Sequence, residues 1–68
     1  MKERLKKLRK ELKLSQDRFA EKIFLTGRAL ANYESGFRQP DNMTIAMICK
    51  VFHVRDEWLR FGEGEMVY

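Results

Sequence analysis

Two side chains that can read nucleic-acid bases lie four residues apart in the middle of the chain. Arg28 carries a rigid fork of hydrogen-bond donors, and Asn32 carries an amide that both donates and accepts. Gly27 and Ala31 beside them are small, so a helix over this stretch would present a close-fitting, hydrogen-bonding outer face. The major groove of DNA accepts an exposed helix of this kind on a basic protein.

The remaining residues give little indication of a catalytic site. Cys49 lies four residues before His53, but a nucleophile–base pair also needs a third group to orient the base, and none follows. The chain contains no carboxylate pair, glycine-rich phosphate loop or cluster of metal ligands. The sequence therefore predicts no enzyme, metal site or cofactor, and it predicts that Cys49 is an inert buried thiol.

The candidate base-reading stretch is the second of two short helices predicted between Ser15 and Gly36. Ser15 can cap a helix over 15–22, in which Phe19, Ala20 and Ile23 follow at helical spacing. A cap at residue 26 can begin a second helix over 26–35, and Gly36 stands where a helix end needs a positive φ. Helices of about eight residues are marginal alone, so we expect other helices to hold this pair.

Composition bounds the remaining possibilities. The 68 residues make one domain, and the single Cys excludes a disulfide framework. The net charge of +4 favours an anionic partner without identifying it. No apolar run approaches the roughly 18 residues of a membrane span, and no signal peptide begins the chain. We therefore expect a cytoplasmic protein with no membrane partner and no small-molecule substrate.

Residues 1–13 predict a basic amphipathic helix. Leu5, Leu8 and Leu12 form its apolar stripe, surrounded by seven Lys or Arg and only Glu3 and Glu11 as acids. Such a surface is either simply solvated or attracts phosphates over about a Debye length. A membrane-surface role is the weakest of the three interpretations, because three leucines make a poor wedge.

The second half of the chain predicts two further helices. Asp41 can cap a helix over 42–53, and His53 can end it because His tolerates positive φ. Before that helix, Phe37 is predicted to fill the core and Arg38 to be exposed. The expected core face comprises Ile45, Ile48, Cys49 and Phe52, widened by Met43, Met47 and Val51.

A last helix is predicted over 54–61, followed by a short C-terminal tail over 63–68. Trp58 and Leu59 would face the core or a partner. The tail is glycine-rich and acidic and then apolar, so it is either loose or recruited into an interface. The prediction is an all-α fold of five helices over residues 1–62.

A set of residues spread through the chain carries a family resemblance. The chain resembles the phage repressor and Cro-like helix-turn-helix (XRE) family at Gln16-x-x-Phe19-Ala20, Leu25-Thr26, Leu30, Asn32-Tyr33-Glu34-Ser35-Gly36, Arg38 and Pro40, continuing through Ile45, Ile48, Phe52, Val54 and Trp58-Leu59. The likeness covers about residues 4–62. It implies a five-helix lambda-repressor-like domain with its helix-turn-helix at about 15–36. Members of the family bind double-stranded operator DNA, usually as dimers on half-sites about 34 Å apart.

The resemblance also implies roles for individual residues. The positions matching base readers are Gly27, Arg28, Ala31 and Asn32, and those predicted to contact phosphates are Gln16, Thr26 and Arg38. Arg28 can bind guanine and Asn32 adenine, each worth about 1–3 kcal/mol of discrimination, and Ala31 can touch a thymine methyl. Arg9 matches an arginine that pairs with the position of Glu34, which makes these two a structural ion pair.

Three positions depart from the family pattern. Phe24 stands where the corner between the helices usually has Gly, so we expect a different turn there. His53 replaces a common Gly. Arg55 replaces the usual Ser or Asn cap of the last helix, so Asp56 is expected to take over as the cap and shift that helix by one residue.

Two functions stay open at this stage. The first is a sequence-specific DNA-binding regulator, in particular a repressor of a phage-like or mobile-element promoter. The second is a protein-interaction module, such as an antitoxin or anti-repressor, with an apolar patch of Phe61, Met66, Val67 and Tyr68. For a homodimer, the candidate interface is Trp58, Leu59, Phe61 and the C-terminal tail. The competing interpretation is that Trp58 and Leu59 only close the core and the tail is disordered.

Overall fold

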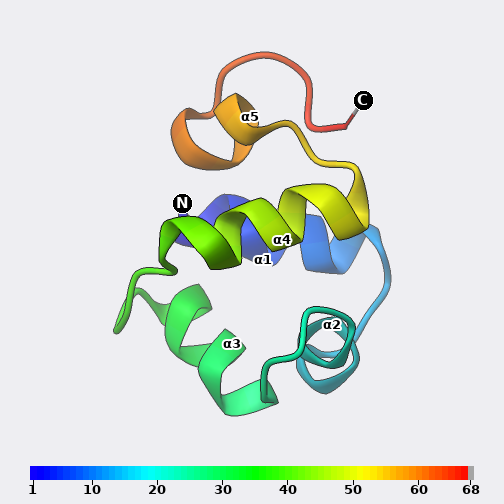
Figure 1. Cartoon of the computed structure of the whole chain (residues 1–68), viewed down its shortest axis with the longest axis vertical. Coiled ribbons are helices and arrows are strands. Elements are labelled where there is room, and N and C mark those ends of the chain that lie inside the picture. Colours follow the sequence, from blue (N-terminus) through cyan, green and yellow to red (C-terminus); the bar gives the residue numbers. More distant parts are fainter. Residues whose placement is uncertain (68) are drawn as a thin grey trace.

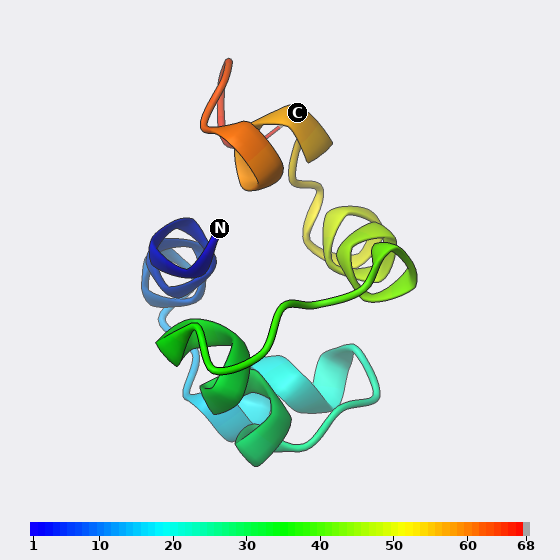
Figure 2. The same ribbon diagram turned by 90° about the vertical axis from the view of Figure 1, so that its left-hand side faces the viewer.

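The computed structural model describes residues 1–67, and five α-helices lie in this range. They are α1 (Lys2–Glu11), α2 (Gln16–Lys22), α3 (Gly27–Ser35), α4 (Asn42–Phe52) and α5 (Asp56–Phe61). Along the longest axis, α2 and α3 lie at one end and α5 at the other (Figure 1). The view turned by 90° shows α1 and α4 on opposite sides of the interior (Figure 2). The all-α, five-helix prediction is confirmed.

Side-chain caps set the starts of three helices. Ser15, Thr26 and Asp41 each accept a hydrogen bond from the backbone N–H three residues on, at 3.1, 3.1 and 2.8 Å. Each bond satisfies an N–H that has no partner within its own helix. The three predicted caps are therefore confirmed, and they begin α2, α3 and α4.

Left-handed residues end two of the helices as predicted. Gly36 ends α3 at φ 85°, and His53 ends α4 at φ 58°. The backbone N–H of His53 donates to the carbonyl of Cys49, so the cap also satisfies an orphan acceptor.

The corner between α2 and α3 differs from the expectation. Phe24 adopts φ 61°, the conformation that a glycine would take, so the prediction of a different turn is wrong. The strain costs roughly 1–2 kcal/mol for a residue with a Cβ. Two facts make it tolerable: the ring is 85% exposed and meets no packing constraint, and the Leu25 N–H donates to the Ala20 carbonyl at 2.9 Å.

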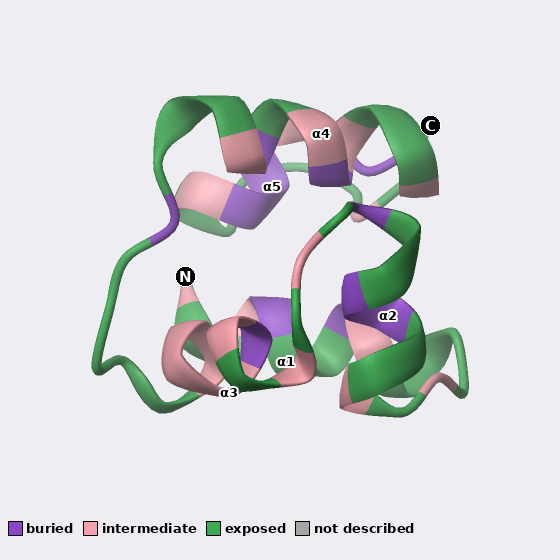
Figure 3. Cartoon of the chain, turned by 60° about the horizontal axis from the view of Figure 1, so that its bottom comes forward, coloured by how far each residue is buried: buried purple, intermediate pink, exposed green. Residues whose placement is uncertain are grey.

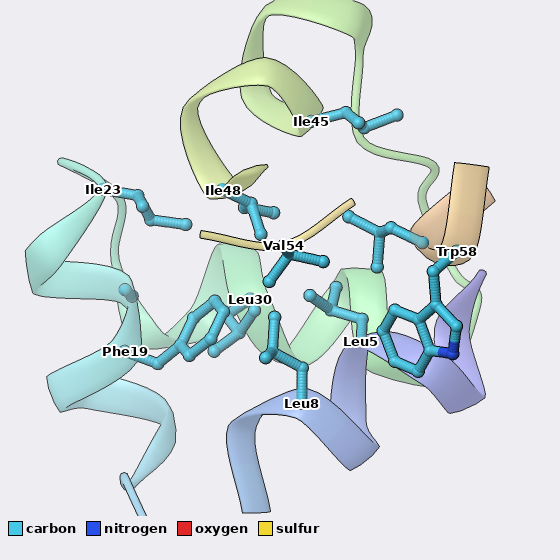
Figure 4. Close-up of a cluster of buried hydrophobic side chains, with 11 residues drawn as sticks. Leu5, Leu8, Phe19, Ile23, Leu30, Ile45, Ile48, Val54 and Trp58 are labelled. Carbon is cyan, nitrogen blue, oxygen red and sulfur yellow. The ribbon is translucent and has the colours of Figure 1, made fainter. Parts of the chain in front are cut away.

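The core draws on all five helices or their ends. Figure 4 shows the buried apolar side chains converging, and the set comprises Leu5, Leu8, Phe19, Ala20, Ile23, Leu30, Ile45, Ile48, Val54, Trp58 and Leu59. The rings of Phe19 and Phe52 stack with centroids 4.3 Å apart, which joins α2 to α4. The helix-turn-helix pair therefore packs on α1, and the stacked rings join it to α4.

Four apolar side chains predicted to lie in the core are exposed: Leu12, Phe37, Met43 and Val51. Leu12 is the C-cap of α1, where the chain already turns away. Phe37 directly follows the left-handed Gly36, which directs it outward. Met43 lies two residues from Ile45, about 200° away around α4, so the two cannot share a face. Burial is therefore predicted wrongly for apolar residues that lie at a helix end or outside the apolar stripe facing the core.

The start of α5 also corrects a prediction. Arg55 occupies the N-cap position without a side-chain cap, and the helix begins at Asp56. The Asp56 carboxylate is engaged elsewhere, since it accepts from Arg60 Nε at 2.8 Å. The shift of this helix by one residue is therefore wrong.

Residues 63–67 fold back on the beginning of α5. Val54 and Val67 form an isolated antiparallel bridge, and the Arg55 N–H donates to the Met66 carbonyl at 2.8 Å. The Met66 side chain packs on the core. This segment is thus held by its own chain, whereas the sequence left open a loose or interface-bound tail. Tyr68, part of the predicted apolar patch, lies outside the described residues.

Candidate nucleic-acid interface

A polar network fixes α3 against α1 and α2. Arg9 donates from Nε to Glu34 Oε2 at 2.7 Å and from Nη2 to Glu34 Oε1 at 3.1 Å, while its Nη1 bonds the Leu14 carbonyl at 2.9 Å. The Glu34 side chain is only 4% exposed. Such a two-point pairing fixes orientation as well as distance. The structure thus brings together the two residues assigned to a structural ion pair.

Gln16 joins the same network from the first turn of α2. Its Nε2 atom donates to Glu34 Oε1 at 3.1 Å. An amide nitrogen carries two hydrogens, so this bond leaves a second donor for a phosphate oxygen. Glu34 therefore positions the side chain that the sequence assigned to phosphate contact, a link that the sequence alone did not reveal.

The outer face of α3 presents the candidate base readers. Arg28 is exposed, while Ala31 and Asn32 are half-buried. Figure 3 shows α3 at the edge of the molecule with half-buried and exposed residues along most of its length. Arg28 has no ion pair within the described residues. Because residues four apart share a helix face, the Arg28 guanidinium and the Asn32 amide lie on the same side of α3.

A contact within the protein also favours glycine at position 27, in addition to its role at the predicted interface. A Cβ at this position would collide with the Asp17 Oδ1 atom of α2. A side chain at this position would therefore force the Asp17 carboxylate to move. This contact adds to the predicted role of Gly27, which was to let the helix approach DNA.

The two remaining candidate phosphate contacts lie at opposite ends of α3. Thr26 is exposed at its N-terminus, and Arg38 follows its C-terminus, with the guanidinium carbon 5.9 Å from the Phe37 ring centroid. The nine residues of α3 span about 13.5 Å at 1.5 Å each. The major groove is about 12 Å wide. The length of α3 is thus close to the width of the groove.

The structure divides the cations of residues 1–13 into two groups. Arg9 belongs to the Glu34 network, and Arg4 donates from Nε and Nη2 to the carbonyls of Leu59 and Arg60 at 3.0 and 2.8 Å. These two arginines hold other elements in place. The five lysines of this stretch are exposed. The sequence offered only a solvated or phosphate-attracting surface, because nothing in it signals that Arg4 reaches α5.

The other chemical features of the described residues concern metal ligands, membrane-spanning helices and the thiol of Cys49. Residues 1–67 contain no group of three or more His, Cys, Asp or Glu side chains arranged to hold a metal ion. None of the helices described is long and apolar enough to cross a membrane. Cys49 is half-buried rather than buried, and burial raises the pKa of its thiol, which keeps it protonated and a poor nucleophile.

The predicted dimer interface is partly wrong. Trp58 is 8% exposed and Leu59 is fully buried, so both belong to the core of one chain. Phe61 and Val67 are exposed and remain available to a partner.

Two short helices at a tight corner, the second locked by a buried ion pair and presenting a polar face, define a helix-turn-helix domain. The family described as "Helix-turn-helix domain" matches residues 2–65. The chain belongs to this family and is an XRE-type DNA-binding domain.

Two curated relatives are similar to the chain. One, from Bacillus subtilis (strain 168), is described as "Uncharacterized HTH-type transcriptional regulator YqaE" and is 41% identical over 62 residues, covering 91% of this chain and 53% of the relative. The "HTH-type transcriptional regulator ImmR" of the same organism is 32% identical over 63 residues, covering 93% of this chain and 49% of the relative. The chain thus spans about half the length of both relatives. No solved structure matches it significantly.

Proposed function

We propose that the chain is the sequence-specific, double-stranded DNA-binding part of a transcriptional regulator and reads the major groove with residues 26–35. The observation that carries the proposal is the pairing of Arg28 and Asn32 on one outer face of a helix whose orientation is fixed by Glu34. A base-reading helix needs such fixed geometry, because a bidentate base contact tolerates little misplacement.

The four base-reading positions have distinct proposed roles. Arg28 donates two hydrogen bonds to guanine O6 and N7, and Asn32 pairs its amide with adenine N6 and N7. Ala31 contacts a thymine methyl group, and Gly27 allows close approach. The exposure of Arg28 and the small size of Gly27 and Ala31 support this assignment.

Phosphate contacts hold the domain in register without reading sequence. Gln16 is proposed to donate its second amide hydrogen to one backbone, with Thr26 beside it. Arg38 is proposed to bind the other backbone, at the far end of α3. The placement of these residues around α3 supports the assignment.

The regulator is proposed to be a homodimer that represses a phage-like or mobile-element promoter from the cytoplasm. Both relatives are described as transcriptional regulators, which supports a regulatory role. With Trp58 and Leu59 in the core, Phe61 and Val67 form the proposed interface, since both are exposed apolar side chains near the end of the chain. No enzymatic activity is proposed.

Selection of bound duplexes from a randomised library at about 150 mM salt tests the proposal. The wild-type chain should enrich an inverted pair of half-sites, with centres about 34 Å apart. Arg28→Ala and Asn32→Ala should each lose preference at defined base pairs and keep the same melting temperature. Lys10→Ala on α1 is the matched control and should enrich the wild-type sequence. Identical sequences from wild type and both α3 variants would show that α3 does not read DNA.

Failure to recover any duplex would favour the alternative function, an antitoxin-like or anti-repressor module. A partner protein captured at equal stoichiometry through Phe61 would then identify that class.

A further inference from the structure

A shallow hollow lies at the C-terminal end of α3, where the start of α1 meets the loop before α4. Its charged and polar lining side chains are Lys2, Glu3, Tyr33, Arg38 and Gln39, and its volume is about 290 Å³. A water molecule occupies about 30 Å³ in the liquid, so the hollow has room for a hydrated phosphate group.

Two cations far apart in the sequence meet in this hollow. Lys2 lies against the end of α3, with its Nζ atom 3.3 Å and its Cδ atom 2.9 Å from the point where a Cβ of Gly36 would be. Arg38 follows Gly36 by two residues and lines the same space. Neither cation has an ion pair within the described residues.

The charge balance of the hollow favours an anion. Glu3 is the carboxylate among the lining residues and offsets one of the two cations, which leaves a net positive charge. An anion in the hollow would be attracted by both cations.

We propose that Lys2 and Arg38 together bind one phosphate of the DNA backbone at the C-terminal end of α3. The inference rests on the proposed function, because it assumes that α3 lies in the major groove. Arg38 is already a proposed phosphate contact. The addition of Lys2 makes α1 part of the interface, and it ties the first residues of the chain to the register of the reading helix.

A purely structural role for Lys2 makes a different prediction. An ammonium at the end of α3 also complements the partial negative charge of the helix C-terminus. In that case its loss would lower the melting temperature of the free protein and leave DNA binding at permissive temperature unchanged.

The test is the salt dependence of affinity for one duplex, measured for wild type, Lys2→Gln, Arg38→Gln and the double variant. The slope of log K against log salt changes by about 0.9 for each phosphate neutralised. A shared phosphate predicts that the double variant loses about one unit of slope. Each single variant should lose less than this and bind about three- to tenfold more weakly.

Two controls isolate the site. Lys7→Gln removes the same charge from the same helix, but Lys7 lines a neighbouring surface with Lys6 and Lys10 and does not line the hollow, so its slope should equal that of wild type. Lys2→Arg retains the charge and should restore the slope. Melting curves of the free variants should coincide with wild type.

The contrary outcomes are distinct. A double variant with the wild-type slope overturns the inference and leaves the proposed function standing. A loss of about two units shows two separate phosphates and overturns the shared site. A wild-type chain with no salt-dependent affinity for DNA overturns both this inference and the proposed function.

Discussion

The α2–α3 end of the molecule and the α4–α5 end bury apolar side chains alike, and they differ in their polar contacts: a largely buried ion pair fixes the α2–α3 end. Directional polar contacts position α3: the Thr26 cap and the bonds of Glu34 to Arg9 and Gln16. Trp58 and Leu59 hold α5 against the core, and Arg4 donates to the carbonyls of Leu59 and Arg60. Hydrogen bonds and ion pairs constrain angles, whereas apolar contact is non-directional. The end proposed to read DNA is therefore oriented by directional contacts from α3 to both α1 and α2.

This difference separates two tasks within one small domain. Apolar side chains from both ends meet in one core, so changes to buried residues at the α4–α5 end should affect folding first. Changes in the Glu34 network should also affect the angle at which α3 is presented. Substitutions at the two ends test that separation.

Leu59→Ala should lower the free energy of unfolding by about 3 kcal/mol, since a fully buried leucine leaves a cavity. Phe61→Ala, two residues along the same helix, should change it by less than about 0.5 kcal/mol because the ring is 67% exposed. Urea unfolding followed by circular dichroism measures both. Equal effects would show that α5 is not held by the core. Under the proposed dimer, Phe61→Ala should also weaken self-association in light scattering.

Glu34→Ala should lower the free energy of unfolding by about 2–3 kcal/mol, because it leaves the Arg9 guanidinium unpaired in a largely buried position. It should also relax base preference in the library selection, because α3 and Gln16 lose their shared anchor. Glu21→Ala, an exposed acid on α2, is the control and should be neutral in both measurements. A loss of stability with base preference intact would show that the network does not set the reading angle.

Arg4→Ala should cost about 1–2 kcal/mol, since two carbonyls at the end of α5 lose charge-assisted hydrogen bonds. The exposed Lys6 provides the matched control, and Lys6→Ala should leave the unfolding midpoint in place. Base preference at the library positions should be the same in both variants. A change of preference in Arg4→Ala would mean that the two ends of the molecule are coupled.

Asp41→Ala should produce the smallest loss, seen as a lower melting temperature, because it removes the exposed cap of α4. The hydrogen bond from the Thr44 backbone N–H lowers the pKa of the Asp41 carboxyl below its ordinary value of 3.8. The folded state therefore favours the ionised form. The contribution is complete above the unfolded pKa and is lost as pH falls through the folded one. The difference between wild type and variant should be constant near pH 7 and shrink below about pH 4.

Local signals in the sequence were sufficient for the helix boundaries near α2, α3 and α4. Ser15, Thr26 and Asp41 cap because their own oxygen reaches an N–H three residues on, and Gly36 ends α3 because it accepts a positive φ. These interactions involve neighbours in the chain, so a single sequence contains what is needed to find them.

Side-chain burial was less predictable in the second half of the chain, and so was the backbone conformation at the corner between α2 and α3. Phe37 and Met43 are apolar but exposed, while Trp58 and Leu59 fill the core instead of an interface. Phe24 keeps a glycine-like conformation despite its ring. Hydrophobicity identifies a residue that gains from burial, but which residues are buried depends on which helix faces meet.

By itself, then, the sequence determined the class of fold, the helix-turn-helix segment and the small polar set on its outer face. Those features follow from residue type, spacing and local capping. The tertiary structure decided which cations are structural and which are exposed, because Arg4 reaches carbonyls 55 and 56 residues away and Arg9 a carboxylate 25 residues away. It also brought Lys2 beside Arg38. Contacts between distant segments depend on how the packed helices orient, and no local pattern encodes that orientation.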